Sequence, residues 1–226
     1  MTPILVIAIL TAPALFAIAM GCFLLRRAFA RPQCLPEEMA LAVAWVFIVG
    51  SLVWLGVYLS GSTLLGFGEP WTWITALHFA FAGFGSLTVT ALTCRSVSNR
   101  RALKVLRILL FAHPFTYLVT AAGISGFRYC DELGAMSYEL IFVAQLGAFV
   151  LGQPNRIAYG PRVLLSVALA VPVLTLVPAL AWAFGNPIFD LSGMVRYHGI
   201  VNAIGHVGFA FVAFVWGRPQ SHALFR

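Results

Sequence analysis

Seven long apolar runs limit this chain to one kind of fold. They cover roughly residues 4–25, 39–60, 71–94, 103–123, 134–152, 161–184 and 196–216. About 18 consecutive apolar residues are enough to cross a bilayer as a helix. Only 9% of the residues are charged, against about a quarter in an ordinary soluble domain. We therefore predict an all-α fold, a polytopic membrane bundle of seven transmembrane helices that forms a single domain over residues 1–226.

The basic residues predict how the bundle is oriented. Of the 14 Lys and Arg residues, all but Arg128 and Arg196 fall in alternate connections or at the C-terminal end. Cytoplasmic loops of membrane proteins carry such an excess of Lys and Arg. This places the N-terminus outside and the C-terminus inside a multi-pass protein of the plasma membrane. Arg26 and Arg27 follow the first run, whereas a signal peptide carries its charge first, so we interpret that run as a retained helix.

The predicted excess of Lys and Arg in the inner loops also accounts for the net charge of +7. No basic face interleaved with aromatic residues is present, so nucleic acid is not expected as a partner. Membrane lipids, with their anionic headgroups, are the expected partners of the basic loops. The four cysteines show no CxxC spacing, so the sequence predicts neither a zinc site nor a disulfide framework.

Polar residues inside the apolar runs are the strongest functional signal. His198, Asn202 and His206 follow one another at intervals of four, which places them along one face of the last helix. An ionisable side chain in hydrocarbon is costly unless it faces the bundle interior, which makes it a functional candidate. The candidates come from several runs and gather toward the outer half of the predicted bundle. They predict a polar pocket there, formed by His78, His113, Tyr117, Glu139, Asp190, Arg196, His198, Asn202 and His206.

These residue types favour proton-transfer chemistry on a lipophilic metabolite. Glu139, in an apolar pocket, would stay protonated and act as a general acid, and His198 or His78 would act as the base. Asn202 would position an oxygen, and Arg196 would stabilise developing negative charge. The remaining polar residues would contact the substrate. The sequence thus predicts an isomerase, a cyclase or an epoxide-opening enzyme that needs no cofactor.

Other interpretations of the same residues stay open. A small-molecule or proton-coupled transporter is the main alternative, because carriers also use buried Glu and His and helices broken by proline. A metal site ligated by histidines is less expected, because His198 and His206 lie about 12 Å apart along a helix. His113 and His206 also suit a purely structural role as hydrogen bonds between helices. Asp190 and Arg196 could form a simple salt bridge at the mouth of the bundle.

Two segments resemble the YndJ-like integral membrane family. They are HFAFAGF at 78–84 and RYHGIVNAIG at 196–205. The resemblance implies importance for His78, Arg196, His198 and Asn202, without implying a reaction. The family pattern leads us to expect an aromatic residue after the last glycine, where this chain has His206. In size and topology the chain is also similar to small seven-helix membrane terpene cyclases, by analogy of fold alone.

Overall fold

The structure, a computed structural model, describes residues 1–222 and is built from helices. Seven helical segments are long and apolar enough to cross a membrane, as the sequence predicts. Each extends beyond its predicted apolar run at one end or both, and the fifth and sixth helices end one residue before their predicted runs do. Their bounds are Pro3–Phe29, Pro36–Ser60, Trp71–Ser96, Arg100–Ile124, Cys130–Leu151, Tyr159–Ala183 and Leu191–Gly217.

The chain divides into two compact units, Met1–Thr88 and Val89–Arg226. The single domain inferred from the sequence stays a prediction, and so does the orientation in the membrane.

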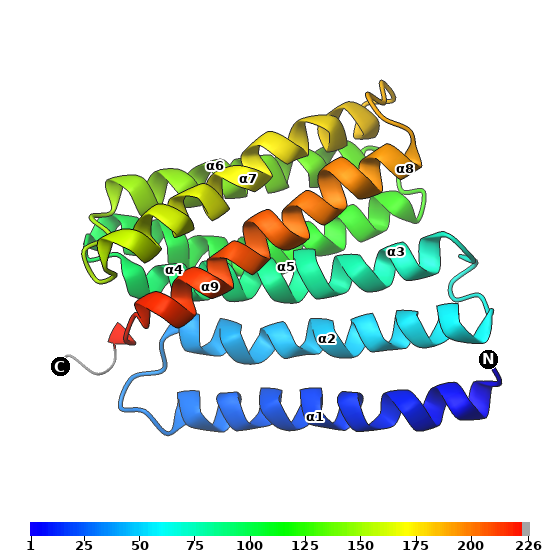
Figure 1. Cartoon of the computed structure of the whole chain (residues 1–226), viewed down its shortest axis with the longest axis horizontal. Helices are drawn as coiled ribbons and strands as arrows, with labels where there is room; N and C mark the ends of the chain where they lie inside the picture. The colour runs from blue at the N-terminus through cyan, green and yellow to red at the C-terminus, as the bar shows by residue number, and fades with distance from the viewer. Residues whose placement is uncertain (223–226) are drawn as a thin grey trace. The chain divides into compact units, whose positions relative to one another are not determined.

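The first unit is a set of neighbouring antiparallel helices (Figure 1). It contains α1 (Pro3–Phe29), α2 (Pro36–Ser60), α3 (Trp71–His78) and the π-helix η1 (Phe79–Gly85), and α2 packs against α1, α3 and η1. A salt bridge of 2.9 Å from Arg31 to Glu38 closes the connection between α1 and α2. Gly83 gives the Phe47 ring room to pack directly on the η1 backbone.

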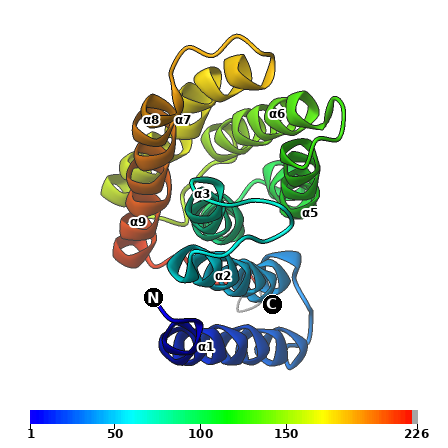
Figure 2. The same cartoon turned by 90° about the vertical axis from the view of Figure 1, so that its right-hand side faces the viewer.

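The second unit is organised around α7. It contains most of α4 (Ser86–Ser96), then α5 (Arg100–Ile124), α6 (Cys130–Leu151) and α7 (Tyr159–Ala183). The last span comprises α8 (Leu191–Gly193), η2 (Met194–Ile200), η3 (Asn202–Gly208) and α9 (Phe209–Gly217). Helix α6 packs between α5 and α7, as Figure 2 shows, and the last span lies along α7.

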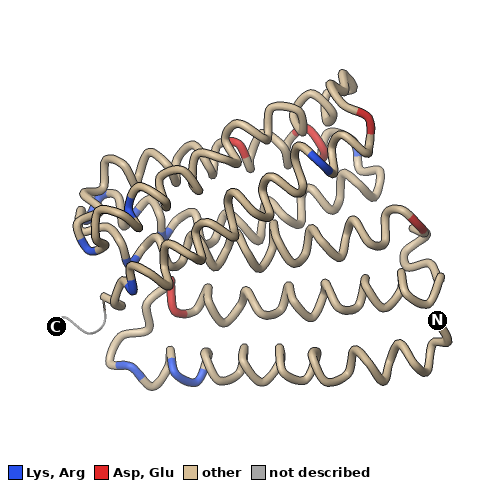
Figure 3. The backbone as a smooth tube through the Cα atoms, in the orientation of Figure 1, with Lys and Arg blue, Asp and Glu red and all other residues tan. Residues whose placement is uncertain are grey.

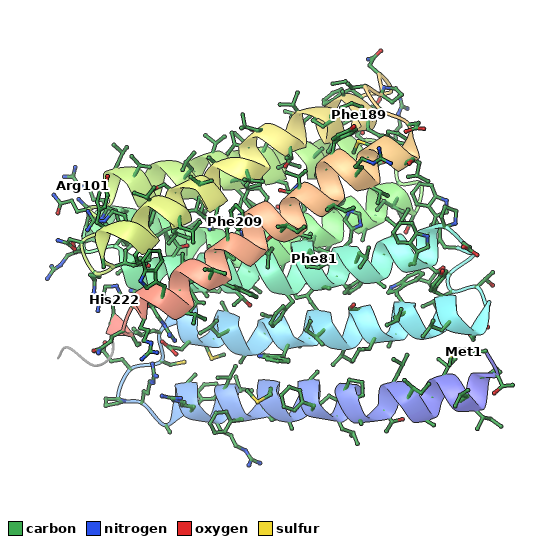
Figure 4. The ribbon with its side chains drawn as sticks, viewed as in Figure 1. Met1, Phe81, Arg101, Phe189, Phe209 and His222 are labelled. Atoms are coloured by element: carbon green, nitrogen blue, oxygen red, sulfur yellow. The ribbon has the colours of Figure 1, made fainter. Side chains whose placement is uncertain are left out.

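Lys and Arg residues of the second unit gather mainly at one end, near the α4–α5 and α6–α7 connections (Figure 3). Arg101 and His222 are both found at this end (Figure 4). His222 Nε2 donates to the Cys94 carbonyl over 2.9 Å, and Arg156 donates to the Gln220 carbonyl over 3.1 Å. These bonds attach the chain beyond α9 to the rest of the unit.

Three stretches of π-helix interrupt the α-helical spans. In a π-helix the hydrogen bonds join residues five apart, and such segments are rare and often occur at functional sites. One is η1, within the segment HFAFAGF, and the other two are η2 and η3, within RYHGIVNAIG and its continuation. Nothing in the hydropathy of the sequence predicted them.

Candidate functional site

The polar face of the last span lies against α7. His198 Nδ1 donates to the Thr175 carbonyl over 2.8 Å, and His206 Nδ1 donates to the Ala168 carbonyl over 2.9 Å. Between them, Asn202 Oδ1 accepts a hydrogen bond of 2.9 Å from Thr175 Oγ1. The single face predicted from the spacing of four is therefore present, and it is used to join two helices.

His198 and Asn202 form a hydrogen-bond network with Thr175 on this face. Asn202 Nδ2 donates to the His198 carbonyl over 2.9 Å, while Asn202 Oδ1 binds Thr175. The Asn202 side chain therefore uses both its donor and its acceptor within the protein. This arrangement fits the role of polar side chains that hold helices together in membranes.

Deeper in the second unit, aromatic and imidazole rings from three helices meet around Phe142. The His206 ring from η3 lies 5.2 Å from the Phe142 ring of α6, and the His113 ring of α5 lies 5.6 Å from it on centroids. Tyr138, one turn earlier in α6, stacks on Phe142 at 6.0 Å and lies 6.1 Å from His113. We call His113, Tyr138, Phe142 and His206 the ring cluster.

The ring cluster is nearly closed to solvent. The exposed fraction is 2% for His113, 7% for Tyr138 and 1% for His206. Leu176 of α7 completes its buried packing, and Tyr117 of α5 packs against it from outside. Because His113 lies near the middle of α5 and His206 near the middle of the last span, the cluster lies deep within the length of the helices.

Polar atoms in the ring cluster lack hydrogen-bond partners among the described residues. They are His113 Nδ1, Tyr138 Oη and His206 Nε2. The other nitrogen of His113 is bonded, because Nε2 lies 2.9 Å from Thr90 Oγ1. Buried polar groups are nearly always paired in native proteins, so each exception calls for a ligand, a bound water or a chemical role.

Gln145 extends this feature along α6. It lies one turn beyond Phe142 on the same buried face, its exposed fraction is 0%, and neither its Nε2 nor its Oε1 has a partner in the described part of the chain. Four side chains on three helices thus carry unpaired donors or acceptors in the interior of one unit.

A family model for the YndJ-like proteins matches residues 3–206. The chain belongs to the YndJ-like family. Both segments that resembled this family, 78–84 and 196–205, lie within the match, which therefore includes His206 and all the π-helical turns up to it. No curated protein and no solved structure matches the chain.

Among the residues that the YndJ-like resemblance marked, His78 lies in the first unit. Its Nδ1 donates to the Ile74 carbonyl of its own helix over 2.9 Å. Its proposed partnership with Glu139 stays a prediction, because the two residues belong to different units. Arg196 is exposed on η2.

Glu139 follows Tyr138 directly and is half-buried at the edge of the buried face of α6. Its Oε2 is buried and has no hydrogen-bond partner among residues 1–222.

Asp190 has a structural role that the sequence did not predict: its Oδ1 accepts from the Gly193 amide over 2.7 Å and caps α8.

Sequence reasoning missed Tyr138, Phe142 and Gln145. A signal was present, because these residues repeat at intervals of four and three along the face of α6 that also carries Gly134 and Phe149. This is the spacing of residues that face a partner helix. A charged residue is costlier to bury than a phenol or an amide, so the sequence alone indicated Glu139 as the functional candidate in α6.

No group of three or more His, Cys, Asp or Glu side chains within residues 1–222 is arranged to hold a metal ion. In the ring cluster the polar atoms come from two imidazoles and a phenol, with an amide nearby. Imidazole, phenol and amide groups are able to donate and accept hydrogen bonds.

Proposed function

We propose that this YndJ-like protein is an integral membrane acid–base enzyme that isomerises, cyclises or opens the epoxide of a lipophilic metabolite. One observation supports this most: the rings of His113, Tyr138 and His206, from three helices, surround Phe142, and each of them carries an unpaired polar atom. Unpaired polar atoms inside an apolar helix bundle are suited to bind a substrate that is mostly apolar and carries a small polar group.

In this proposal the residues divide the proton transfers between them. Glu139, with a buried and unpaired Oε2, donates a proton to an alkene carbon or an epoxide oxygen of the substrate. His206 Nε2 removes the proton of a substrate hydroxyl, either in the isomerisation of an enol or in a cyclisation that this oxygen closes, so the product keeps the mass of the substrate. In an epoxide opening by water, His206 removes a proton from that water and the product gains one water.

His198 and Asn202 have a different part in this proposal from the one predicted. Their side chains bind Thr175 of α7, so they position the last span and with it His206. Tyr138 and His113 orient the substrate oxygen, and Tyr117 contributes to the wall behind them.

A deuterium experiment tests the proposal. The purified protein in nanodiscs is incubated in D2O with the total lipid extract of its host membranes, and the lipids are analysed by mass spectrometry. An isomerisation or cyclisation that begins with protonation of an alkene carbon should give a product with one deuterium on carbon, and an epoxide opening should give a species heavier than the substrate by one water once its O–D groups have exchanged. Both should be lost in Tyr138→Phe and in Glu139→Gln.

Tyr197→Phe is the matched control, because Tyr197 is an exposed tyrosine on η2 that packs on Phe189 with ring centroids 5.0 Å apart. It should leave the product unchanged. If the wild type forms no new lipid species, or if Tyr138→Phe forms as much as the wild type, the proposal is wrong. Uptake of a lipid into sealed vesicles without chemical change would favour the transporter instead.

A further inference from the structure

His206 makes its hydrogen bond to a carbonyl that α7 itself leaves available. In an α-helix the carbonyl of residue 168 accepts from the N–H of residue 172, and residue 172 is Pro172, which has no N–H. The Ala168 carbonyl therefore lacks its helical donor, and His206 Nδ1 supplies one over 2.9 Å. A buried carbonyl without a hydrogen-bond donor would destabilise the fold, so the His206 bond offsets the donor that α7 lacks at Pro172.

This bond determines which nitrogen of His206 carries the proton. A carbonyl oxygen only accepts, so Nδ1 must be the N–H, and in the neutral imidazole Nε2 is then an acceptor. That Nε2 is buried and has no donor within the described residues. It lies in the ring cluster, where Tyr138 Oη, which can donate and accept, is also unpaired.

We infer that Pro172 is a positioning residue that fixes the His206 tautomer, and that the ring cluster consequently binds a neutral lipophilic molecule through its hydroxyl group. The hydroxyl donates to His206 Nε2 and accepts from Tyr138 Oη. This inference rests on the proposed function, since it names the substrate class of the same site. A neutral molecule is expected because the unpaired atoms of the ring cluster come from two imidazoles and a phenol, and because Glu139, the carboxyl of the same proposed site, is protonated and neutral before the reaction.

Gly205 supports the same geometry. A methyl carbon built on Gly205 would lie 3.1 Å from Val171 Cγ2. The absence of a side chain at Gly205 thus allows η3 to approach α7 beside Pro172, which brings the next residue, His206, within reach of the Ala168 carbonyl.

Nitrogen NMR of 15N-histidine-labelled protein tests the tautomer. We expect the wild type to show Nδ1 protonated and Nε2 unprotonated at His206. In Pro172→Ala the restored N–H competes for the Ala168 carbonyl, so the Nε2-protonated form should appear. Pro178→Ala is the matched control: it restores a bond to the Leu174 carbonyl, to which His206 is not bonded, and should leave the His206 signal unchanged. A wild-type His206 protonated at Nε2, or a Pro172→Ala spectrum identical to the wild type, would overturn the inference.

The second measurement tests the hydroxyl. The probe is the neutral-lipid fraction of the host membranes, used as extracted and after acetylation of its hydroxyl groups. The untreated fraction should shift the His206 Nε2 signal of the wild type, and the acetylated fraction should not. Equal shifts from both fractions, or none from either, would show that no hydroxyl binds there. A shift without any new product in the D2O experiment would leave this inference standing and reject the enzyme.

Discussion

At the scale of single residues, the distinctive feature is the buried hydroxyl of Tyr138, which has no partner among the described residues. Removing an unpaired buried group relieves its desolvation cost, so Tyr138→Phe should leave the free energy of unfolding unchanged or raise it by up to about 1 kcal/mol. Thermal unfolding in detergent measures this. A loss of stability of more than about 1 kcal/mol would mean that the hydroxyl has a structural partner in the folded protein.

Thr90 should behave in the opposite way. Its Oγ1 lies 2.9 Å from His113 Nε2, and Thr90→Val keeps the shape of the side chain but leaves that buried nitrogen unpaired. We expect a loss of about 1–3 kcal/mol in the free energy of unfolding, measured by the same thermal unfolding. Equal stability of Thr90→Val and the wild type would show that this bond contributes nothing.

The sequence identified both histidines of the ring cluster because ionisable residues are rare inside apolar runs. It did not identify Tyr138 and Gln145, which are ordinary on a helix and become notable only when the structure shows that they lack partners. It assigned Asn202 to the substrate, whereas the structure shows that the side chain is bonded to Thr175 and to the His198 carbonyl.

At the scale of elements, close packing of η3 on α7 predicts different outcomes at two glycines of the last span. Gly205→Leu would force side-chain atoms against Val171 and should destabilise the protein by about 1–3 kcal/mol. Gly199 is exposed, and the nearest atom to a carbon built there is the Met194 carbonyl oxygen at 3.9 Å. Gly199→Leu should therefore change stability by less than about 0.5 kcal/mol. Equal unfolding temperatures for the two variants would contradict this packing.

The spans themselves follow from hydropathy, because a helix is the simplest way to satisfy backbone polar groups inside lipid. Hydropathy does not predict the π-helical turns η1, η2 and η3. The hydrogen bonds of a π-helix join residues five apart and those of an α-helix residues four apart, and this difference of one residue leaves the apolar pattern of the sequence almost unchanged. Proline positions were visible in the sequence, but the link between Pro172 and His206 needed the packing of α7 against the last span.

At the scale of the whole molecule, the distribution of Lys and Arg predicts an outside N-terminus. Variants that retain a single cysteine test this with a membrane-impermeant maleimide. Cys130, at the start of α6, should be labelled in intact cells, and Cys34, in the α1–α2 connection, only after lysis. Cys94 is buried and should stay unlabelled in both cases. Labelling of Cys34 in intact cells would show that the orientation is the reverse of the predicted one.

We propose that the ring cluster is a binding site and not a defect of packing. An experimental density map of the protein, purified from its host membranes into nanodiscs, tests this. We expect density that the protein does not account for, at about 3 Å from both Tyr138 Oη and His206 Nε2. If both atoms were instead bonded to other side chains, with no density between them, the cluster would be structural and the proposed chemistry would have no site.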